Sequence, residues 1–244
     1  MKKEKLLIFI PAYNVESKIA KVLNKIPKII FKKYNAKILI IEDNSNDKTL
    51  FTIKKISKKR TYRKIVTFIS NKINKGYGGV QKIAYNYAVK KKYKYVVMLH
   101  GDNQYPAYKI LSLIKPLCTD KYDAVFGSRM IKSIDALKGG MPLYKFLGNK
   151  VLTFFQNLVL SSNLSEFHSG YRSYKVASLQ KIKYKNNTND FHFDTEIIIQ
   201  FLKKDFSIKE FPMPTHYGDE FSHLRSIPYG LNIVRVTLLS RLKK

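Results

Sequence analysis

A chain of 244 residues with 45% hydrophobic residues, 11 glycines and 8 prolines has the size and composition of a large globular domain, which excludes a disordered or low-complexity chain. Its 46 basic and 17 acidic residues give a formal net charge of +29, which indicates either a polyanionic partner or compositional drift. Only seven of the basic residues are Arg, the side chain that readers of bases and phosphates favour, and the lysines are spread along the chain. We therefore expect no nucleic-acid partner, whereas an anionic membrane surface or a phosphorylated substrate stays open.

The single cysteine, Cys118, excludes a disulfide framework within the chain and fits a reducing compartment. The first apolar run stops at Pro11, which is too early for the core of a signal peptide, and no segment has the length of a membrane-spanning apolar helix. We expect a cytoplasmic protein, with a peripheral position at the inner face of the cell membrane as an alternative.

Predicted strands and helices alternate through the first 118 residues. Apolar runs predict strands over residues 6–10, 37–41, 65–70 and 95–99. Apolar residues at helical spacing predict a helix after Ser17 that Pro27 kinks or ends, and further helices over 48–59, from near Val80 to Lys91, and after Pro106. This alternation is typical of a parallel sheet with right-handed crossovers, so we expect an α/β fold.

The pattern loosens in the second half of the chain. We expect a short strand over 124–127, a long amphipathic helix over 144–160, a polar turn region over 164–174, a helix over 193–202 and a strand over 206–211. A last amphipathic helix covers 227–242. The two amphipathic helices can pack on the protein or lie on a bilayer, and the sequence leaves both alternatives open.

Polar side chains follow three of the predicted strands: Tyr13 and Glu16 the first, Asp43 the second, and Asp102 and Gln104 the fourth. Ligands of parallel sheets bind at the carboxyl ends of the strands, so these side chains are candidates for one site. Asp102 and Gln104 offer oxygens to one Mg²⁺ or Mn²⁺ ion, although Asp followed by Asn is also common in ordinary turns. Tyr13 suits stacking on a base, and Asp43 suits hydrogen bonds from a base or ribose.

A glycine-containing loop, Lys75-Gly76-Tyr77-Gly78-Gly79, leads into the third predicted helix. Free backbone N–H groups at a helix N-terminus favour phosphate, so we predict that Lys75, Gly76 and Gly78 contact one. The glycine spacing matches neither the dinucleotide fingerprint nor the P-loop. Acidic strand ends, this loop and a two-ligand metal turn together indicate a nucleotide diphosphate held through a cation.

The segments PAYNVE, EDNSNDKT, NKGYGG, GDNQYP and GSR, in this order and spacing, resemble family 2 glycosyltransferases with the GT-A fold. Within that family they resemble the branch of dolichyl-phosphate mannose and glucose synthases. The resemblance runs from Leu6 to about Arg225 and implies a mostly parallel central sheet flanked by helices, with a C-terminal acceptor-side helical lobe. It implies one domain over 1–225, with a donor half over about 1–130 and an acceptor half over about 131–225. The helix in 226–244 would pack on this domain or on a membrane surface.

The resemblance also implies roles for individual residues. It implies nucleotide-sugar binding by a set at the first two strand ends, Pro11, Tyr13, Glu16 and Asp43. It implies a divalent cation, Mn²⁺ or Mg²⁺, on Asp102 and Gln104, with His100 in the position where the family usually has an Asp. It implies an acceptor phosphate near Arg129. Two later segments, HSGYRSY and FHFDTEIIIQ, look like acceptor-side motifs and add Arg172, Asp194 and Glu196 as candidates.

The reaction implied is displacement at the anomeric carbon of a nucleotide sugar, with inversion, while the cation stabilises the departing diphosphate. A lipid phosphate acceptor needs positioning by Arg129 and Arg172 but no general base. A sugar hydroxyl, as on a surface glycan, needs a carboxylate, for which Glu196 is our choice, and Asp194 has helix capping as its alternative role. Asp102 takes part in catalysis in both cases.

Three departures from the family affect these expectations. His100 binds Mn²⁺ when neutral but removes one negative charge from the metal site. Asn44 and Lys48 stand where the family usually has glycines. The segment THYGDEFSHLR, with His216, Asp219, Glu220 and His223, replaces an Arg followed by a Gly-x-Ser-Lys run that would mark a polyprenyl-phosphate acceptor.

One other class remains as an alternative, and the first loop argues against a second. A non-catalytic module with the same fold would bind a nucleotide sugar, an anionic membrane surface or another protein, and His100 and the net charge motivate it. A nucleotidyltransferase would carry a glycine- and Arg-rich loop after the first strand, and PAYN is not that loop.

Overall fold

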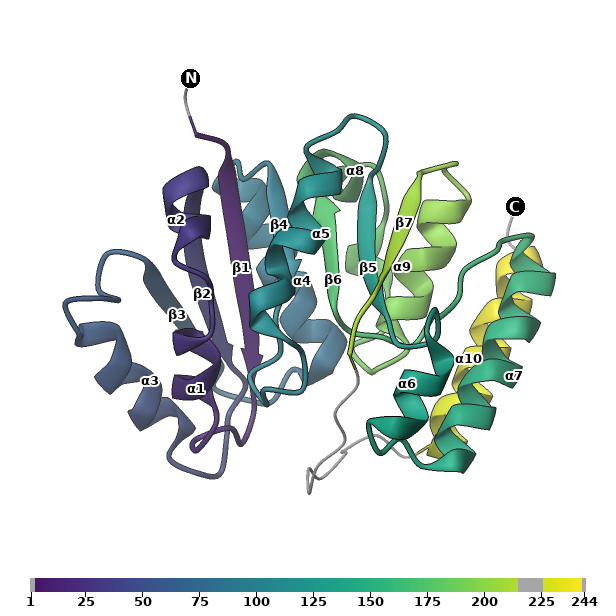
Figure 1. Cartoon of the computed structure of the whole chain (residues 1–244), viewed down its shortest axis with the longest axis horizontal. Coiled ribbons are helices and arrows are strands. Elements are labelled where there is room, and N and C mark those ends of the chain that lie inside the picture. The colour runs from purple at the N-terminus through teal and green to yellow at the C-terminus, as the bar shows by residue number, and fades with distance from the viewer. Residues whose placement is uncertain (1–2, 215–225, 243–244) are drawn as a thin grey trace.

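The computed structural model describes residues 3–214 and 226–242. Seven strands form one sheet in the order β3-β2-β1-β4-β6-β5-β7, with helices on both faces (Figure 1). The strands are β1 (Lys5–Ala12), β2 (Asn35–Glu42), β3 (Val66–Ser70), β4 (Tyr95–Met98), β5 (Ala124–Ser128), β6 (Arg172–Lys175) and β7 (Ile208–Pro212). The first four strands are parallel to one another, as the alternation of elements predicted.

Helices cover both faces of the sheet. They are α1 (Ile19–Asn24), α2 (Ile29–Lys33), α3 (Thr49–Lys58), α4 (Gly76–Lys90), α5 (Ile110–Leu117), α6 (Ser133–Lys138), α7 (Leu143–Leu160), α8 (Val176–Gln180), α9 (Phe193–Leu202) and α10 (Ser226–Leu242), with short 3₁₀ turns at Ala107–Lys109 and Tyr184–Asn186. The side chains of β1 alternate between two apolar clusters. Leu6, Ile8 and Ile10 pack with α1, α2, α3 and α5, whereas Leu7 and Phe9 pack with α4, α8 and α9. Cover on both faces explains why the strand is apolar without alternation.

The sequence prediction of a turn region over 164–174 is wrong at its end, because residues from Arg172 onward form β6. This strand lies between β4 and β5 and is antiparallel to both. Its polar sequence, RSYK, hid a central strand. The Ser173 hydroxyl is satisfied by the carbonyls of Leu113 and Val125, at 3.1 and 3.2 Å, so a serine can be fully buried here.

Other differences are at element boundaries. The helix expected from near Val80 begins at Gly76, and the first helix is divided at Pro27 into α1 and α2. The short helices α6 and α8 carry no periodic signal and were not expected. The segment that contains His216, Asp219, Glu220 and His223 lies outside the described residues.

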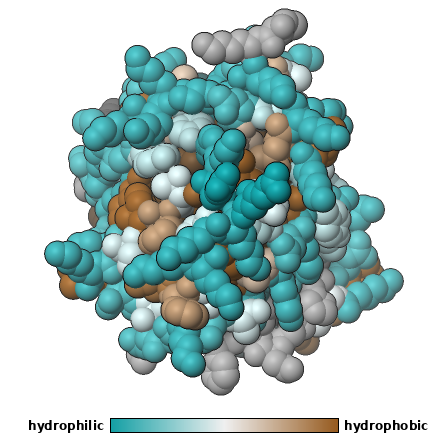
Figure 2. All heavy atoms as spheres, turned by 90° about the vertical axis from the view of Figure 1, so that its left-hand side faces the viewer, coloured by the Kyte–Doolittle hydropathy of each residue, from teal (hydrophilic) through white to brown (hydrophobic). Residues whose placement is uncertain are grey.

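The helices α6, α7 and α10 lie together beyond the β7 side of the sheet, at the right of Figure 1, where α10 packs against α7 and α9. The opposite end of the molecule, formed by α3 and the β3 edge, presents mostly hydrophilic side chains to the solvent (Figure 2). Within residues 3–214 and 226–242, no helix has the length and apolar character needed to cross a bilayer.

Candidate active site

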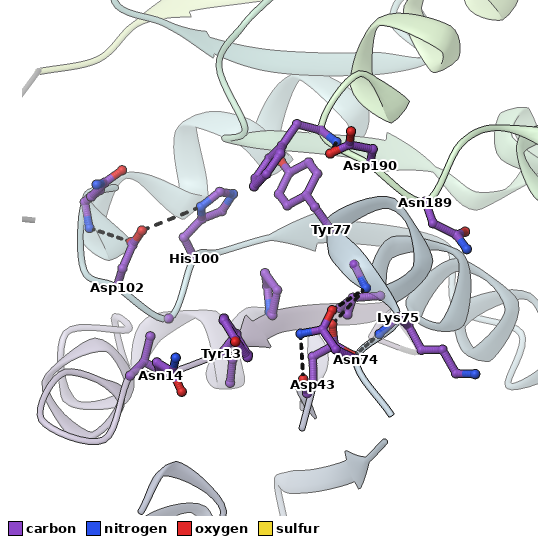
Figure 3. A pocket seen from close by; sticks show the side chains of 18 of the residues that line it. Tyr13, Asn14, Asp43, Asn74, Lys75, Tyr77, His100, Asp102, Asn189 and Asp190 are labelled. Carbon is purple, nitrogen blue, oxygen red and sulfur yellow. Dashed lines mark hydrogen bonds and ion pairs between the residues drawn. The ribbon is translucent and has the colours of Figure 1, made fainter. Parts of the chain in front are cut away.

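A pocket of about 1060 Å³ opens where β1, β2 and β4 end (Figure 3). The strand order changes direction between β1 and β4, and such switch points are where α/β sheets bind ligands. The predicted site residues that line the pocket are Pro11, Tyr13, Asp43, Lys75, Gly76, His100, Asp102 and Gln104. The pocket is completed by Thr188, Asn189 and Asp190, which the sequence did not single out, and by Phe191, the first residue of the FHFDTEIIIQ segment.

Two polar turns, at the ends of β1 and β2, are bonded to each other. The amide of Asn14 donates to the Ser45 hydroxyl at 3.1 Å, and the amide of Asn46 donates to the Asn14 side chain at 2.9 Å. Glu16 accepts from the amide of Lys48 at 3.2 Å and is not among the pocket-lining residues. Glu16 thus helps to hold the two turns together beside the pocket.

The carboxylate of Asp43 organises the start of α4. It is 4% exposed and accepts from the amides of Lys75 (2.8 Å) and Gly76 (3.0 Å) and from the side chain of Asn71 (2.7 Å). The amide of Gly78 donates to the Asn189 carbonyl at 2.7 Å. The expectation that these backbone N–H groups are free for phosphate is therefore corrected: a protein carboxylate and a carbonyl already accept from them. Lys75 still lines the pocket, with an exposed side chain.

Arg172 and Asp194 form a buried pair behind the pocket wall. The Arg172 Nε lies 3.6 Å from an Asp194 oxygen, and the guanidinium also donates to the carbonyls of Ser169 (2.6 Å) and Phe167 (2.5 Å). Burial alone would lower the pKa of Arg172, but the charge of Asp194 raises it above its usual value. Asp194 also accepts from the hydroxyl of Tyr77 at 2.8 Å, and Tyr77 lines the pocket. The pair therefore positions Tyr77 and does not itself face the pocket.

Glu196 and Gly78 also act on the pocket from behind. Glu196 accepts from the amide of Thr188 at 2.7 Å, which fixes the segment before α9. Gly78 lies against the same segment, where a Cβ atom would come within 2.5 Å of the Thr188 carbonyl. Neither residue is among those that line the pocket, so the structure brings them next to the site without bringing them into it.

Arg129 pairs with Glu166, a residue that the sequence analysis missed. Glu166 is 2% exposed and accepts from the Arg129 amide (2.7 Å), the Arg129 Nε (2.8 Å) and the Asn149 side chain (2.9 Å). Burial alone would raise the pKa of Glu166, but the charge and hydrogen bonds of Arg129 hold it below its usual value. Arg129 is therefore held in place by a buried carboxylate and lies outside the pocket lining.

The candidate metal ligands lie in the turn that follows β4. His100 Nδ1 is 4.0 Å from an Asp102 oxygen, and the other Asp102 oxygen accepts from the Gln104 amide at 3.0 Å. A Cβ at Gly101 would lie 2.8 Å from the Pro11 carbonyl, so this glycine lets the ends of β1 and β4 approach. Figure 3 shows His100 turned toward Asp102 at one side of the pocket.

This donor set suits a divalent cation. Burial lowers the pKa of His100, so the imidazole is neutral near pH 7, and Nδ1 is its ring nitrogen on the side of Asp102. The Nε2 is buried on the side of Gly170, with no hydrogen-bond partner among the described residues. No group of three or more His, Cys, Asp or Glu residues that would hold a metal occurs in the described part of the chain. One carboxylate, one amide oxygen and one imidazole nitrogen fit Mn²⁺ better than Mg²⁺, which favours oxygen.

Comparison with known proteins adds three findings. The family model described as Glycosyl transferase family 2 matches residues 7–183. The UDP-N-acetylglucosamine–dolichyl-phosphate N-acetylglucosaminyltransferase of Methanococcus voltae is 26% identical over 250 residues, covering 98% of this chain and 97% of that protein. The dolichyl-phosphate beta-glucosyltransferase of Saccharomyces cerevisiae is 25% identical over 231 residues, covering 88% of this chain and 67% of that protein.

Among solved structures, this chain is similar to glucosyl-3-phosphoglycerate synthase from Mycobacterium tuberculosis, in a crystal structure with Mn²⁺, UDP and glucosyl-3-phosphoglycerate. The TM-score is 0.67 at 14% sequence identity, and the match covers 98% of this chain and 80% of that one. At this identity the similarity shows that the two chains share a fold.

Proposed function

The chain belongs to glycosyl transferase family 2, and on that premise we propose that it moves a hexose from a nucleotide-diphosphate sugar to a polyprenyl phosphate, with inversion at the anomeric carbon. The observation that carries the proposal is the one pocket lined jointly by Tyr13, Asp43, Asp102 and Gln104. These residues come from three strand ends and supply an aromatic ring and several oxygens within one volume. That volume has the size of pockets that take small molecules.

The donor would lie across the ends of β1 and β2. Tyr13 would stack on the base, and Lys75 at the pocket edge would attract the phosphates. Asp43 shapes this end of the pocket by fixing the start of α4. His100, Asp102 and Gln104 would hold a divalent cation, which when bound neutralises the negative charge of the departing nucleotide diphosphate.

A lipid phosphate is the acceptor that the surroundings of the pocket favour. Such a phosphate already carries the charge of a nucleophile and needs no general base. The two carboxylates considered as bases are engaged elsewhere, since Asp194 pairs with Arg172 and Glu196 binds the amide of Thr188. The similarity to two enzymes named for dolichyl phosphate supports the same acceptor class. A sugar hydroxyl of a glycan is the alternative acceptor.

A lipid-linked acceptor would bring the enzyme to the cytoplasmic surface of a membrane. We therefore propose that it acts from the cytoplasm as a peripheral protein, and that its positive charge attracts anionic lipid. A module that binds the nucleotide sugar without transferring the sugar is the alternative function, because His100 leaves the metal site with one negative charge fewer than its relatives usually have.

The test is transfer of labelled sugar from UDP-, GDP-, dTDP- and CDP-sugars to a polyprenyl phosphate, with Mn²⁺ or Mg²⁺. We expect one donor to support transfer and to raise Tm by mass action. Asp102→Ala should reduce transfer at least a hundredfold, whereas Asp120→Ala, which removes a fully exposed carboxylate, should not.

Each other result has its own reading. A donor that raises Tm without any transfer would favour the non-catalytic module. Transfer to a glycan but not to the lipid phosphate would show that the acceptor is a sugar hydroxyl. If no sugar nucleotide bound at all, the proposed function would be wrong.

A further inference from the structure

The long helix α7 buries polar residues and exposes apolar ones. Its buried positions are polar, namely Asn149, Thr153 and Gln156. Its outer positions are large and apolar, and their exposed fractions are at least 52%: Leu143, Leu147, Val151, Phe154 and Leu158. These five follow one another at intervals of three and four, so they form one stripe along the helix. A helix on the surface of a water-soluble domain normally has the opposite arrangement.

The C-terminal helix α10 also exposes a row of apolar residues. Its buried residues are Ile233 and Thr237, while Ile227, Leu231, Leu238 and Leu242 are exposed at the same helical spacing as the stripe on α7. The two helices pack against each other. We call these nine exposed residues of α7 and α10 the outer stripe. Rows of exposed apolar residues on two helices that pack together mark an interaction site.

Polar contacts fix which side of α7 faces the protein. Asn149 donates to Glu166 at 2.9 Å and accepts from the hydroxyl of Thr153 at 3.2 Å. Rotating the helix to bury the outer stripe would break the bond to Glu166 and leave a buried carboxylate with one donor fewer. The outward direction of the stripe is therefore built into the structure. The same Glu166 holds Arg129, so the helix is linked through one side chain to the acceptor-side candidate.

The two helices that form the outer stripe carry only positive charges. The 18 residues of α7 and the 17 residues of α10 include no Asp or Glu. Lys150 is one turn from Phe154, and Arg235 is one turn from Leu231. Cations beside an apolar stripe are complementary to anionic lipid headgroups above acyl chains. They are not complementary to a second copy of this chain, which carries a net charge of +29 and the same cations.

We propose that the outer stripe is the surface on which this protein lies on an anionic lipid bilayer. The helices α7 and α10 lie in the plane of the headgroups, with their polar faces toward the body of the protein. Two exposed apolar residues, Ile131 just before α6 and Ile134 within it, extend the same surface. The biological role of this surface rests on the proposed lipid-linked acceptor, whereas the observations that support the surface do not. The hydrophilic end in Figure 2 faces away from the bilayer.

The chain offers a matched pair of phenylalanines for the test. Phe154 is 71% exposed in the outer stripe, and Phe51 is 66% exposed on α3, at the other end of the molecule. We expect the full-length protein to float with phosphatidylcholine–phosphatidylglycerol vesicles and to float less with phosphatidylcholine alone. Phe154→Glu combined with Leu158→Glu should reduce the bound fraction at least tenfold, whereas Phe51→Glu should leave it unchanged. Equal binding of the two variants would overturn the proposal.

The absence of Trp from the sequence gives a second readout that does not depend on loss of binding. Phe154→Trp should show blue-shifted emission when anionic vesicles are added, and Phe51→Trp should not. An unshifted Phe154→Trp spectrum on vesicle-bound protein would also overturn the proposal. So would a dimer in solution that Phe154→Glu dissociates, because the occupant would then be a second copy.

Vesicles without polyprenyl phosphate or donor separate this proposal from the proposed function. Flotation that depends on the outer stripe, in a protein that transfers no sugar, would support the docking surface and contradict only the enzyme. Sugar transfer together with equal vesicle binding by the Phe154 and Phe51 variants would support the enzyme and contradict only the docking surface.

Discussion

Asn44, at the turn after β2, has a left-handed backbone with φ of 60°, a conformation that glycine adopts without strain. Asn tolerates this conformation better than other residues with a Cβ. Its side chain is exposed, so a substitution tests the backbone alone.

We predict that Asn44→Ala lowers the free energy of unfolding by about 1 kcal/mol and that Asn44→Gly changes it by less than about 0.5 kcal/mol. Urea unfolding of the two variants and the parent protein checks this. Equal stability of the Ala and Gly variants would show that the turn relaxes to another conformation.

His168 gives the stability of the protein a pH dependence. Its Nδ1 lies 2.9 Å from the Tyr229 hydroxyl, and its Nε2 is buried with no hydrogen-bond partner among the described residues. Burial lowers the pKa of His168 to about 4. In the unfolded chain the pKa of His168 is about 6.5, so below this pH the unfolded chain binds a proton on the imidazole that the folded chain does not bind. The free energy of unfolding therefore falls as pH falls.

We therefore predict that the free energy of unfolding decreases between pH 6.5 and pH 4.5, with about 1 to 2 kcal/mol of the decrease due to His168. The difference in stability between the parent protein and His168→Gln isolates this part, because the other titrating groups are common to both. A difference that is constant over this pH range would contradict the shift.

Single residues also show how much of the arrangement follows from the sequence. Tyr13, Asp102 and Gln104 were predicted to share a site because strand ends of a parallel sheet meet at one edge, and they line one pocket. Glu166 was missed because one acidic residue in a polar segment has no periodicity or spacing. Its role comes from its own burial beside Arg129, which only the tertiary structure shows.

Between elements, α4 depends on close packing with the segment before α9. A Cβ at Gly78 would lie 2.5 Å from the Thr188 carbonyl and 2.8 Å from the Phe193 Cβ, and neither atom is the end of a flexible side chain. Gly148, inside α7, is the matched control, since a Cβ there meets nothing within 4 Å.

Gly78→Ala should lower the free energy of unfolding by about 1–3 kcal/mol through overpacking. Gly148→Ala should raise it by about 0.5–1 kcal/mol, because alanine favours a helix. Thermal or urea unfolding of both variants measures the contrast. Similar values for the two would mean that α4 can move away from this segment without cost.

Element prediction succeeded where the burial pattern repeats and failed where polar groups are satisfied inside the fold. The apolar runs of β1, β2 and β4 were identified directly, and the long helices α7 and α9 agree within a few residues. The strand β6 was missed because Ser173 is buried by hydrogen bonds to carbonyls, which no hydrophobic pattern reports. The face that α7 buries also follows from Asn149 and Glu166, not from its apolar residues.

For the molecule as a whole, the α/β class and the family resemblance drawn from the five motifs are confirmed by the sheet and by the family match. The net charge of +29 adds a property of the entire chain. Repulsion among so many cations opposes the compact state, and dissolved salt screens it.

We predict that Tm rises by a few degrees when NaCl is increased from about 20 mM to 300 mM. This rise corresponds to a gain of about 1 kcal/mol in the free energy of unfolding. Sodium sulfate at matched ionic strength is the control, because an equal rise indicates general screening and a larger one indicates anion binding. A Tm that is constant or falls would show that local ion pairs outweigh the net repulsion.

The antiparallel strand β6 has a consequence for synthesis of the chain. Lys175 pairs with Tyr95, so β4 lacks a neighbour on one side until about eighty further residues have left the ribosome. A nascent chain that ends near residue 130 already carries every donor-side candidate, but its β4 has an open edge. We expect such a fragment to associate with other copies of itself through that edge and not to fold into an active transferase.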